Sequence, residues 1–207
     1  MDSPIKLFLI LRFQFFMHSL VIFASGKGSN ALAIIQYFKK NPIAEVKLIV
    51  TNKADAGVLE IATKDNIPSL VVDREAFKSS EFIENVRSYE PSLIVLAGFL
   101  WKIPDAFIDA FRNRIINVHP ALLPDHGGKG MYGHHVHNAV IASGKNESGI
   151  TIHFVDEVYD SGDIIVQARC KVLSDDTADQ LAYRVHQLEH FFFPRTIEYL
   201  LHQGAEG

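Results

Sequence analysis

Cysteine is almost absent from this 207-residue chain. The single cysteine, Cys170, excludes an intramolecular disulfide, and such sparse usage is expected of a protein in a reducing compartment such as the cytoplasm. Cys170 lies between two basic residues in a segment that reads as a strand. We therefore assign it a structural role.

The N-terminal region lacks a hydrophobic run long enough to cross a membrane. Residues 7–11 form a short apolar segment between Lys6 and Arg12, whereas a transmembrane helix needs about 20 apolar residues. A signal peptide is a second interpretation, but no convincing small-residue cleavage site follows the segment. Because Met17 directly precedes the first predicted strand, we expect translation to start there and residues 1–16 to lie upstream of the fold.

Blocks of like charge, repeats, low-complexity tracts and linkers are missing as well. The formal net charge is -4, and nothing indicates a nucleic-acid or membrane surface, although local basic groups could bind small anionic substrates. Hydrophobic residues make up 48% of the chain, which suffices for one well-filled core. We expect a single domain over residues 17–207, with the choice between monomer and dimer left open.

Short apolar segments alternate with helical patterns through the first half of the chain. Asp55 is expected to cap one of the helices, and strands are expected at residues 20–25, 46–50, 70–72, 93–97 and 115–117. This alternation predicts an α/β fold with a Rossmann-like, mostly parallel twisted sheet and helices on both faces.

The pattern changes after residue 117. A loop rich in proline and glycine over residues 120–133 precedes a helix at 134–143, and two C-terminal strands at 149–155 and 163–172 are joined by a turn. A long terminal helix follows over residues 176–201, interrupted at Pro194.

Asn117 and His119 occupy the end of the last apolar strand before the loop. Side chains of an extended strand alternate with a period of two, so both project from one face. Pro120 follows at once and makes further pairing unlikely. An amide donor beside a titratable imidazole suits a reaction that builds negative charge on a carbonyl oxygen. The alternative is a strand cap followed by a turn.

Residues 26–30 (G-K-G-S-N) form a glycine-rich turn between the first strand and a helix. Glycines allow backbone N–H groups to approach a ligand, and a helix N-terminus favours an anion. The turn also fits a loose dinucleotide fingerprint, but the second strand ends at Thr51-Asn52-Lys53 without the acid that would hold a ribose. We therefore favour a monophosphate over a dinucleotide, with an unliganded turn as the alternative.

Asp160 lies in an acidic turn, whose other acids, Asp156, Glu157 and Asp163, read as solvated surface. If the turn folds over the Asn117/His119 strand end, the Asp160 carboxylate would orient His119 and raise its pKa. His134, His135 and His137 suggest a metal site, but their spacing does not place them on one helix face. We expect no metal, and we expect His153 to lie in the core or near the site.

The chain resembles the glycinamide ribonucleotide transformylases (phosphoribosylglycinamide formyltransferases) of purine synthesis, within the formyltransferase fold family. The likeness covers residues 20–200 and rests on A-S-G-K-G-S-N (24–30), T-N-K-A-D-A (51–56), L-A-G-F-L (96–100), N-V-H-P-A-L-L-P (117–124) and D-S-G (160–162). It implies transfer of a formyl group from the co-substrate 10-formyltetrahydrofolate to the amine of glycinamide ribonucleotide, without a metal.

The resemblance also implies roles for individual residues. Asn117, His119 and Asp160 would be catalytic, stabilising a tetrahedral intermediate and moving a proton, and Glu189 would contact the substrate ribose. The substrate phosphate would bind at Gly28, Ser29 and Asn30. The folate would bind along Phe99, Leu100, Trp101, Lys102 and Ile103, and around Val155 and Asp156.

Three positions match the family less cleanly. Arg74, in an R-E-A-F run, is expected to be the family's substrate or folate arginine, with Lys78 as the alternative and a solvated surface arginine as a third possibility. Trp101-Lys102 stands where an arginine is more usual. The loop over residues 125–133 differs from the familiar P-x-x-x-G pattern and receives no assigned role.

Two other classes of function remain as alternatives. A methionyl-tRNA formyltransferase would carry an extra C-terminal domain and a basic surface, and a formyltetrahydrofolate deformylase an N-terminal regulatory domain. A non-catalytic nucleotide-binding module would use only residues 26–30 and would leave Asn117, His119 and Asp160 unexplained.

Deletion of residues 1–16 tests the expected start of the fold. Because no predicted element includes these residues, we expect the shortened chain to fold and to retain full activity. Solubility, thermal unfolding and turnover of the two forms provide the comparison. An insoluble or inactive product would show that the segment belongs to the domain.

Overall fold

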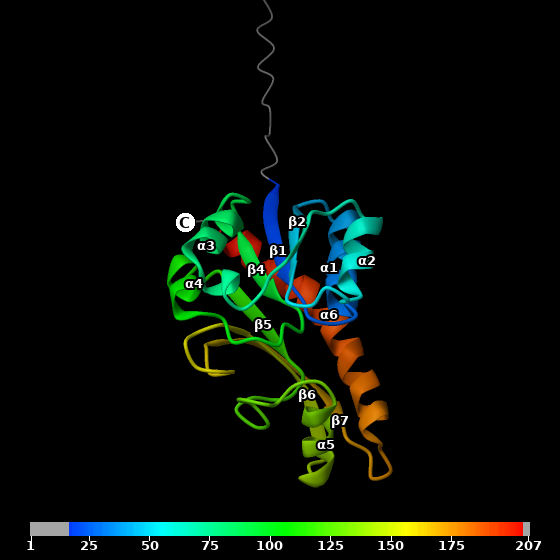
Figure 1. Cartoon of the computed structure of the whole chain (residues 1–207). Coiled ribbons are helices and arrows are strands. Elements are labelled where there is room, and N and C mark those ends of the chain that lie inside the picture. Colours follow the sequence, from blue (N-terminus) through cyan, green and yellow to red (C-terminus); the bar gives the residue numbers. More distant parts are fainter. Residues whose placement is uncertain (1–16, 205–207) are drawn as a thin grey trace, which may run out of the picture.

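Within residues 17–204, seven strands form one sheet in the order β3-β2-β1-β4-β5-β6-β7 (Figure 1). The computed structural model describes residues 17–204, so the expectation for residues 1–16 lies outside the described residues. The strands are β1 His18–Phe23, β2 Ala44–Thr51, β3 Ser69–Val71, β4 Leu93–Leu96, β5 Ile115–His119, β6 Glu147–Phe154 and β7 Ile164–Lys171.

The first five strands run parallel, and β6 and β7 are antiparallel to their neighbours. This confirms the predicted mostly parallel sheet with antiparallel C-terminal strands. The connections place β2 and β3 on one side of β1 and β4 and β5 on the other. The strand order therefore reverses between β1 and β4, and ligands of open α/β sheets bind at such a point, beyond the carboxyl ends of the strands.

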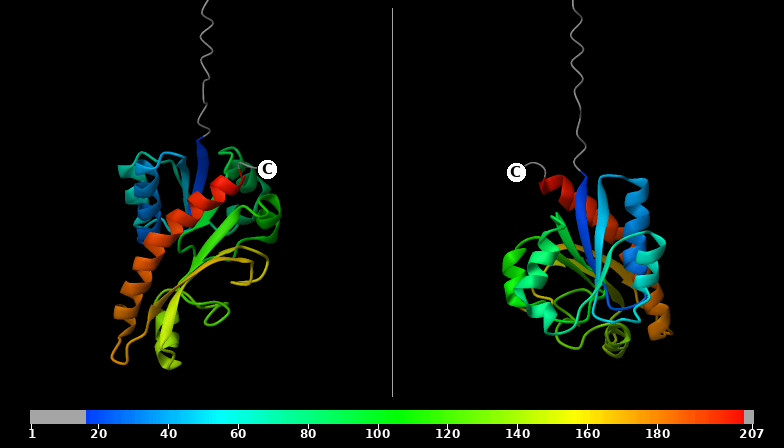
Figure 2. Two further views of the ribbon diagram at one scale, coloured as in Figure 1. Left: turned by 180° about the vertical axis from the view of Figure 1, so that it is seen from behind. Right: turned by 45° about the horizontal axis from the view of Figure 1, so that its top comes forward.

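Helices cover both faces of the sheet (Figure 2). They are α1 Ser29–Lys40, α2 Val58–Lys64, the 3₁₀ helix η1 Ala76–Lys78, α3 Ser80–Arg87, α4 Asp105–Ala110, α5 His134–Ala142 and α6 Ala178–Gly204. Apolar side chains of α1, α2, α5 and α6 pack on one face, and those of η1, α3 and α4 pack on the other. Among residues 17–204, no helix has the length and apolar character to span a membrane.

The central strand β1 is apolar on both sides because it is covered on both sides. Leu20 and Ile22 point into the core beneath α1 and α6, whereas Val21 and Phe23 point into the opposite core. The second core is rich in aromatic rings, with Phe23 lying 5.6 Å from Phe107 between ring centroids. Continuous apolar strands are typical of a sheet buried on both faces.

Two local expectations were wrong. Asp55 does not cap α2, which begins after Gly57. Pro194 does not interrupt the terminal helix, because α6 continues through it to Gly204. An internal proline costs roughly 3 kcal/mol, but Phe193, Ile197 and the proline itself are buried against the sheet, and this packing outweighs the cost.

Phe107→Ala tests the aromatic core. Phe107 is fully buried and contacts the rings of Phe23, Phe82 and Phe111, so its truncation should lower the free energy of unfolding by about 3–5 kcal/mol. Chemical denaturation measures the change. The control is Tyr183→Ala, whose side chain is 67% exposed and whose loss should cost about 0.5 kcal/mol or less. A loss below about 1 kcal/mol for Phe107→Ala would contradict the packing described.

Candidate functional site

A cavity of about 770 Å³ opens at the carboxyl ends of β1, β4 and β5. Its wall is built from six chain segments and the terminal helix, and it includes all predicted site residues except Arg74. The lining comprises residues 25–30, 96–103, 117–120, 128–133, Lys53, His137, His153, 155–156, 158–160, His186 and Glu189.

The glycine-rich turn forms one end of the cavity. Gly28 is the N-cap of α1, has a φ of 77° and has no side chain to occupy the N–H groups of the first helical turn. A Cβ at this position would lie 2.8 Å from Val58 Cβ, so only glycine fits. Ser25 Oγ accepts from the Leu100 amide and donates to Asn52 Oδ1, joining the ends of three strands. The result is a rigid turn with backbone donors suited to an anion.

Glu189 reaches the same end of the cavity from α6. Its side chain is buried, and Asn30 Nδ2 donates to Glu189 Oε2 at 2.9 Å. Burial raises the pKa of Glu189 to about 7, and the hydrogen bond from Asn30 opposes the shift. Two predicted residues separated by 159 positions therefore meet beside the anion-binding turn.

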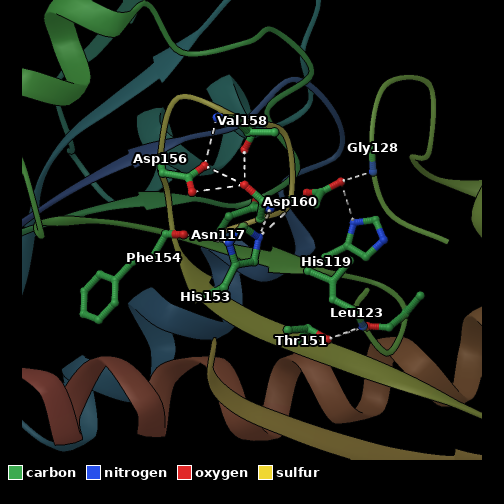
Figure 3. A network of polar contacts seen from close by, with 12 residues as sticks. Asn117, His119, Leu123, Gly128, Thr151, His153, Phe154, Asp156, Val158 and Asp160 are labelled. Atoms are coloured by element: carbon green, nitrogen blue, oxygen red, sulfur yellow. Dashed lines mark hydrogen bonds and ion pairs between the residues drawn. The ribbon is translucent and has the colours of Figure 1, made fainter. Parts of the chain in front are cut away.

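Asn117, His119 and Asp160 meet at the centre of the cavity, together with His153 from β6 (Figure 3). Asp160 lies between the two imidazoles: its Oδ2 is 3.6 Å from His119 Nδ1 and its Oδ1 is 3.7 Å from His153 Nε2. Asn117 and His119 share a face, as predicted, and the acidic turn folds over them. His153 is a near-site histidine, as expected.

His153 orients the amide of Asn117. The Phe154 carbonyl lies 2.7 Å from His153 Nδ1, and a carbonyl can only accept, so this nitrogen carries a proton. In the neutral ring, Nε2 is then an acceptor, and Asn117 Nδ2 donates to it at 3.2 Å. The second N–H of the amide remains for a ligand.

Burial lowers the pKa of His119. The neighbouring Asp160 and the His126 carbonyl, which lies 2.8 Å from His119 Nε2, oppose this shift, whereas His153 and the His126 ring add to it. The Asp160 carboxylate acts in the expected direction and raises the pKa of His119. The desolvation of a nearly fully buried imidazole outweighs the carboxylate, so the net shift is downward.

The other end of the cavity is broad and more apolar. Phe99, Leu100, Trp101, Lys102 and Ile103 line one wall, with Val155 and Asp156 also lining the cavity. Leu100 and Tyr159 are exposed near its mouth. Asp156 is not simply solvated surface, because it accepts hydrogen bonds from the Val158 amide and the Ser161 hydroxyl and so holds the turn before Asp160. Glu157 and Asp163 are exposed, as expected.

Arg74 lies beside the cavity wall. Its guanidinium carbon is 4.9 Å from the centroid of the Trp101 ring, a cation–π contact. Lys78, the alternative, is exposed at the end of η1. The contact with Trp101 connects Arg74 to the apolar wall but not to the glycine-rich turn.

Sequence reasoning missed several residues of the cavity. Lys53 follows β2 and could have been found from its place after a parallel strand, and His186 lies three positions before Glu189 on α6. His137 is buried, and its pKa is lowered to about 4, chiefly by burial. Among the described residues, no group of three or more His, Cys, Asp or Glu side chains is arranged to hold a metal ion.

Comparison with known proteins identifies relatives of this fold and site. Residues 18–197 match the family described as Formyl transferase. The chain is 42% identical over 187 residues to the chloroplastic phosphoribosylglycinamide formyltransferase of Vigna unguiculata, covering 87% of this chain and 60% of that protein. It is 37% identical over 188 residues to the phosphoribosylglycinamide formyltransferase of Escherichia coli K12, covering 87% and 86%.

Solved structures of phosphoribosylglycinamide formyltransferases are also similar to this chain. The glycinamide ribonucleotide transformylase 1 of Symbiobacterium toebii superposes with a TM-score of 0.82 at 32% identity, covering 90% of this chain and 89% of that one. The chain spans less than two thirds of the plant relative but most of the bacterial ones. The family match extends over nearly all of the described residues. The chain therefore belongs to the formyl transferase family.

Proposed function

We propose that the protein transfers the formyl group of 10-formyltetrahydrofolate to the amine of glycinamide ribonucleotide, a step of de novo purine synthesis. The observation that carries the proposal is the meeting of Asn117, His119 and Asp160 in one cavity, between an anion-binding turn and an apolar wall. Relatives named phosphoribosylglycinamide formyltransferase support the choice of substrates.

Glycinamide ribonucleotide would bind at the turn end of the cavity. The N–H groups at the start of α1, over Gly28, Ser29 and Asn30, would hold its phosphate. Glu189, buried beside Asn30, would accept hydrogen bonds from ribose hydroxyls. A monophosphate with an adjacent ribose fits this pairing of a helix N-terminus with a carboxylate.

The reacting atoms would meet at Asn117 and His119. The substrate amine attacks the formyl carbon, a C–N bond forms, and the carbonyl oxygen becomes an oxyanion. The free N–H of Asn117 and a protonated His119 would stabilise that charge. Collapse of this tetrahedral intermediate breaks the bond between the formyl carbon and N10 of the folate. The proton lost by the attacking amine passes to N10, with Asp160 assisting.

The folate would occupy the apolar end of the cavity. Its rings would pack along residues 99–103 and around Val155 and Asp156, and its carboxylates would extend toward Arg74. A guanidinium stacked on an indole keeps its N–H edges for bidentate binding of a carboxylate, so we prefer Arg74 to Lys78 for this role.

The same proposal includes a cytoplasmic location, in keeping with the single cysteine. It requires only small-molecule substrates, without a nucleic acid, a membrane or a metal, because the named side chains supply the donors and the proton. The protein would act as a monomer or a dimer.

Formyl transfer by site variants tests the proposal. His119→Ala and Asp160→Asn should each lower turnover by roughly 10² or more, because each loses a group that stabilises the oxyanion or moves the proton. Formylated glycinamide ribonucleotide is measured directly. His202→Ala and Asp109→Asn, both on exposed side chains, should retain full activity.

Two results would contradict the proposal. Release of folate without formylated product would indicate a deformylase or another acceptor, and substrate binding without turnover would indicate a binding module.

The unusual pKa of Glu189 gives a second test. Its ordinary pKa of 4.5 is raised to about 7 in the fold. The stability that the protonated side chain contributes is therefore complete below pH 4.5 and is lost as the pH rises through 7. Glu189→Gln keeps an acceptor for Asn30 and removes the ionisation. The variant should gain up to roughly 3 kcal/mol relative to wild type between pH 4.5 and pH 8.

Denaturant unfolding at several pH values measures this gain. Glu147→Gln is the control, because its side chain is 53% exposed and pairs with Arg169 at the surface. A difference between Glu189→Gln and wild type that does not change with pH would show that the carboxyl group is not perturbed by burial.

A further inference from the structure

The loop over residues 125–133 contacts the His119/Asp160 pair through its backbone. The proposed mechanism does not use this loop. His126, Gly127 and Gly128 form the part of the loop closest to the pair. Their contacts hold the two titratable side chains of the pair in fixed positions.

The His126 carbonyl determines which nitrogen of His119 carries a proton. It lies 2.8 Å from Nε2, and since a carbonyl oxygen can only accept, Nε2 must be protonated. The nitrogen that faces Asp160 Oδ2, at 3.6 Å, is therefore Nδ1. Protonation of Nδ1 is then the variable that distinguishes the neutral ring from the imidazolium.

The Gly128 amide acts on the other member of the pair. It donates to Asp160 Oδ2 at 2.8 Å, and this carboxyl oxygen lies 3.6 Å from His119 Nδ1. The amide therefore holds Oδ2 beside the nitrogen whose protonation changes.

The backbone packs closely against its neighbours at Gly127. A Cβ on Gly127 would lie 2.6 Å from Leu123 Cδ2 and 3.3 Å from Asp160 Cβ. His126 and Gly128 have φ values of 55° and 95°, so the chain turns sharply on both sides of Gly127. This turn presents a carbonyl to His119 and, two residues later, an N–H to Asp160.

The surroundings of His119 otherwise favour its neutral form. Apart from Asp160, the titratable groups that face it are His153, His126 and His137, which are cationic or neutral but never anionic. Burial lowers the pKa of His119, and only Asp160 and the His126 carbonyl are found to oppose this among the described residues. The loop supplies one of these contacts and, through the Gly128 amide, holds in place the side chain that supplies the other.

We propose that residues 126–128 position the reaction's proton: the His126 carbonyl fixes the Nε2 proton of His119, and the Gly128 amide holds Asp160 Oδ2 beside Nδ1, so that Nδ1 is the nitrogen that takes up and releases the exchangeable proton. The inference rests on the proposed function for its catalytic meaning. The protonation pattern itself is independent of turnover. His126 and Gly128 are thus positioning residues that act through His119 and Asp160.

Nitrogen-15 NMR of the wild-type protein labelled at histidine tests the protonation pattern without any substrate. The resonances of His119 are assigned by their loss in His119→Ala. We expect Nε2 to stay protonated across the titration and Nδ1 alone to change with pH. An unprotonated Nε2 at high pH would overturn the proposal, whether or not the protein transfers a formyl group.

Gly127→Ala tests the loop. The added Cβ should push residues 126–128 away from Asp160, lower kcat by about 10- to 100-fold with little change in KM, and move the titration of His119 to lower pH. The control is Gly204→Ala, where a Cβ meets nothing within 4 Å and neither kcat nor the titration should change. A folded Gly127→Ala variant with an unchanged His119 titration would overturn the proposal. If this variant does not fold, the NMR titration of the wild-type protein decides whether the proposed protonation pattern is correct.

Discussion

The antiparallel pairing of β5 with β6 is the contact on which the site geometry depends. It sets Asn117 opposite His153 and His119 opposite Thr151, so the two strands bring three side chains of the candidate site together. Thr151 is buried, donates to the Ala121 carbonyl and accepts from the Leu123 amide. The chain that leaves β5 is therefore anchored to β6 before the loop begins, which gives the loop backbone a fixed starting point beside His119.

Burial is the main electrostatic influence in the cavity, and directed hydrogen bonds oppose it. It drives His119 and Glu189 toward their neutral forms, in opposite pKa directions. The carbonyl of His126 favours the charged form of His119, and the amide of Asn30 favours that of Glu189. In such a site, small differences in contact decide where protons reside.

The sequence predicted the parts of the site that follow from local periodicity. The alternation of strands and helices gave the parallel sheet, and the period of two placed Asn117 and His119 on one face. Spacing alone could not place Asp160, His137 or His186, because their contacts depend on how a turn and two helices fold back over the sheet. The errors at Asp55 and Pro194 have the same origin, since local preference was outweighed by packing that is invisible along the chain.

A loop that contacts a site through its backbone places few requirements on its side chains. Every residue type offers a carbonyl like that of His126, and every residue except proline offers an amide like that of Gly128. Loops of different sequence can therefore serve the same pair, provided that the chain makes the same turn. The turn does favour glycine at two positions. Gly127 is confined by Asp160 and Leu123, and Gly128 adopts a φ that favours glycine. Within residues 125–133, the glycines are therefore the residues whose identity matters most for the shape of the loop.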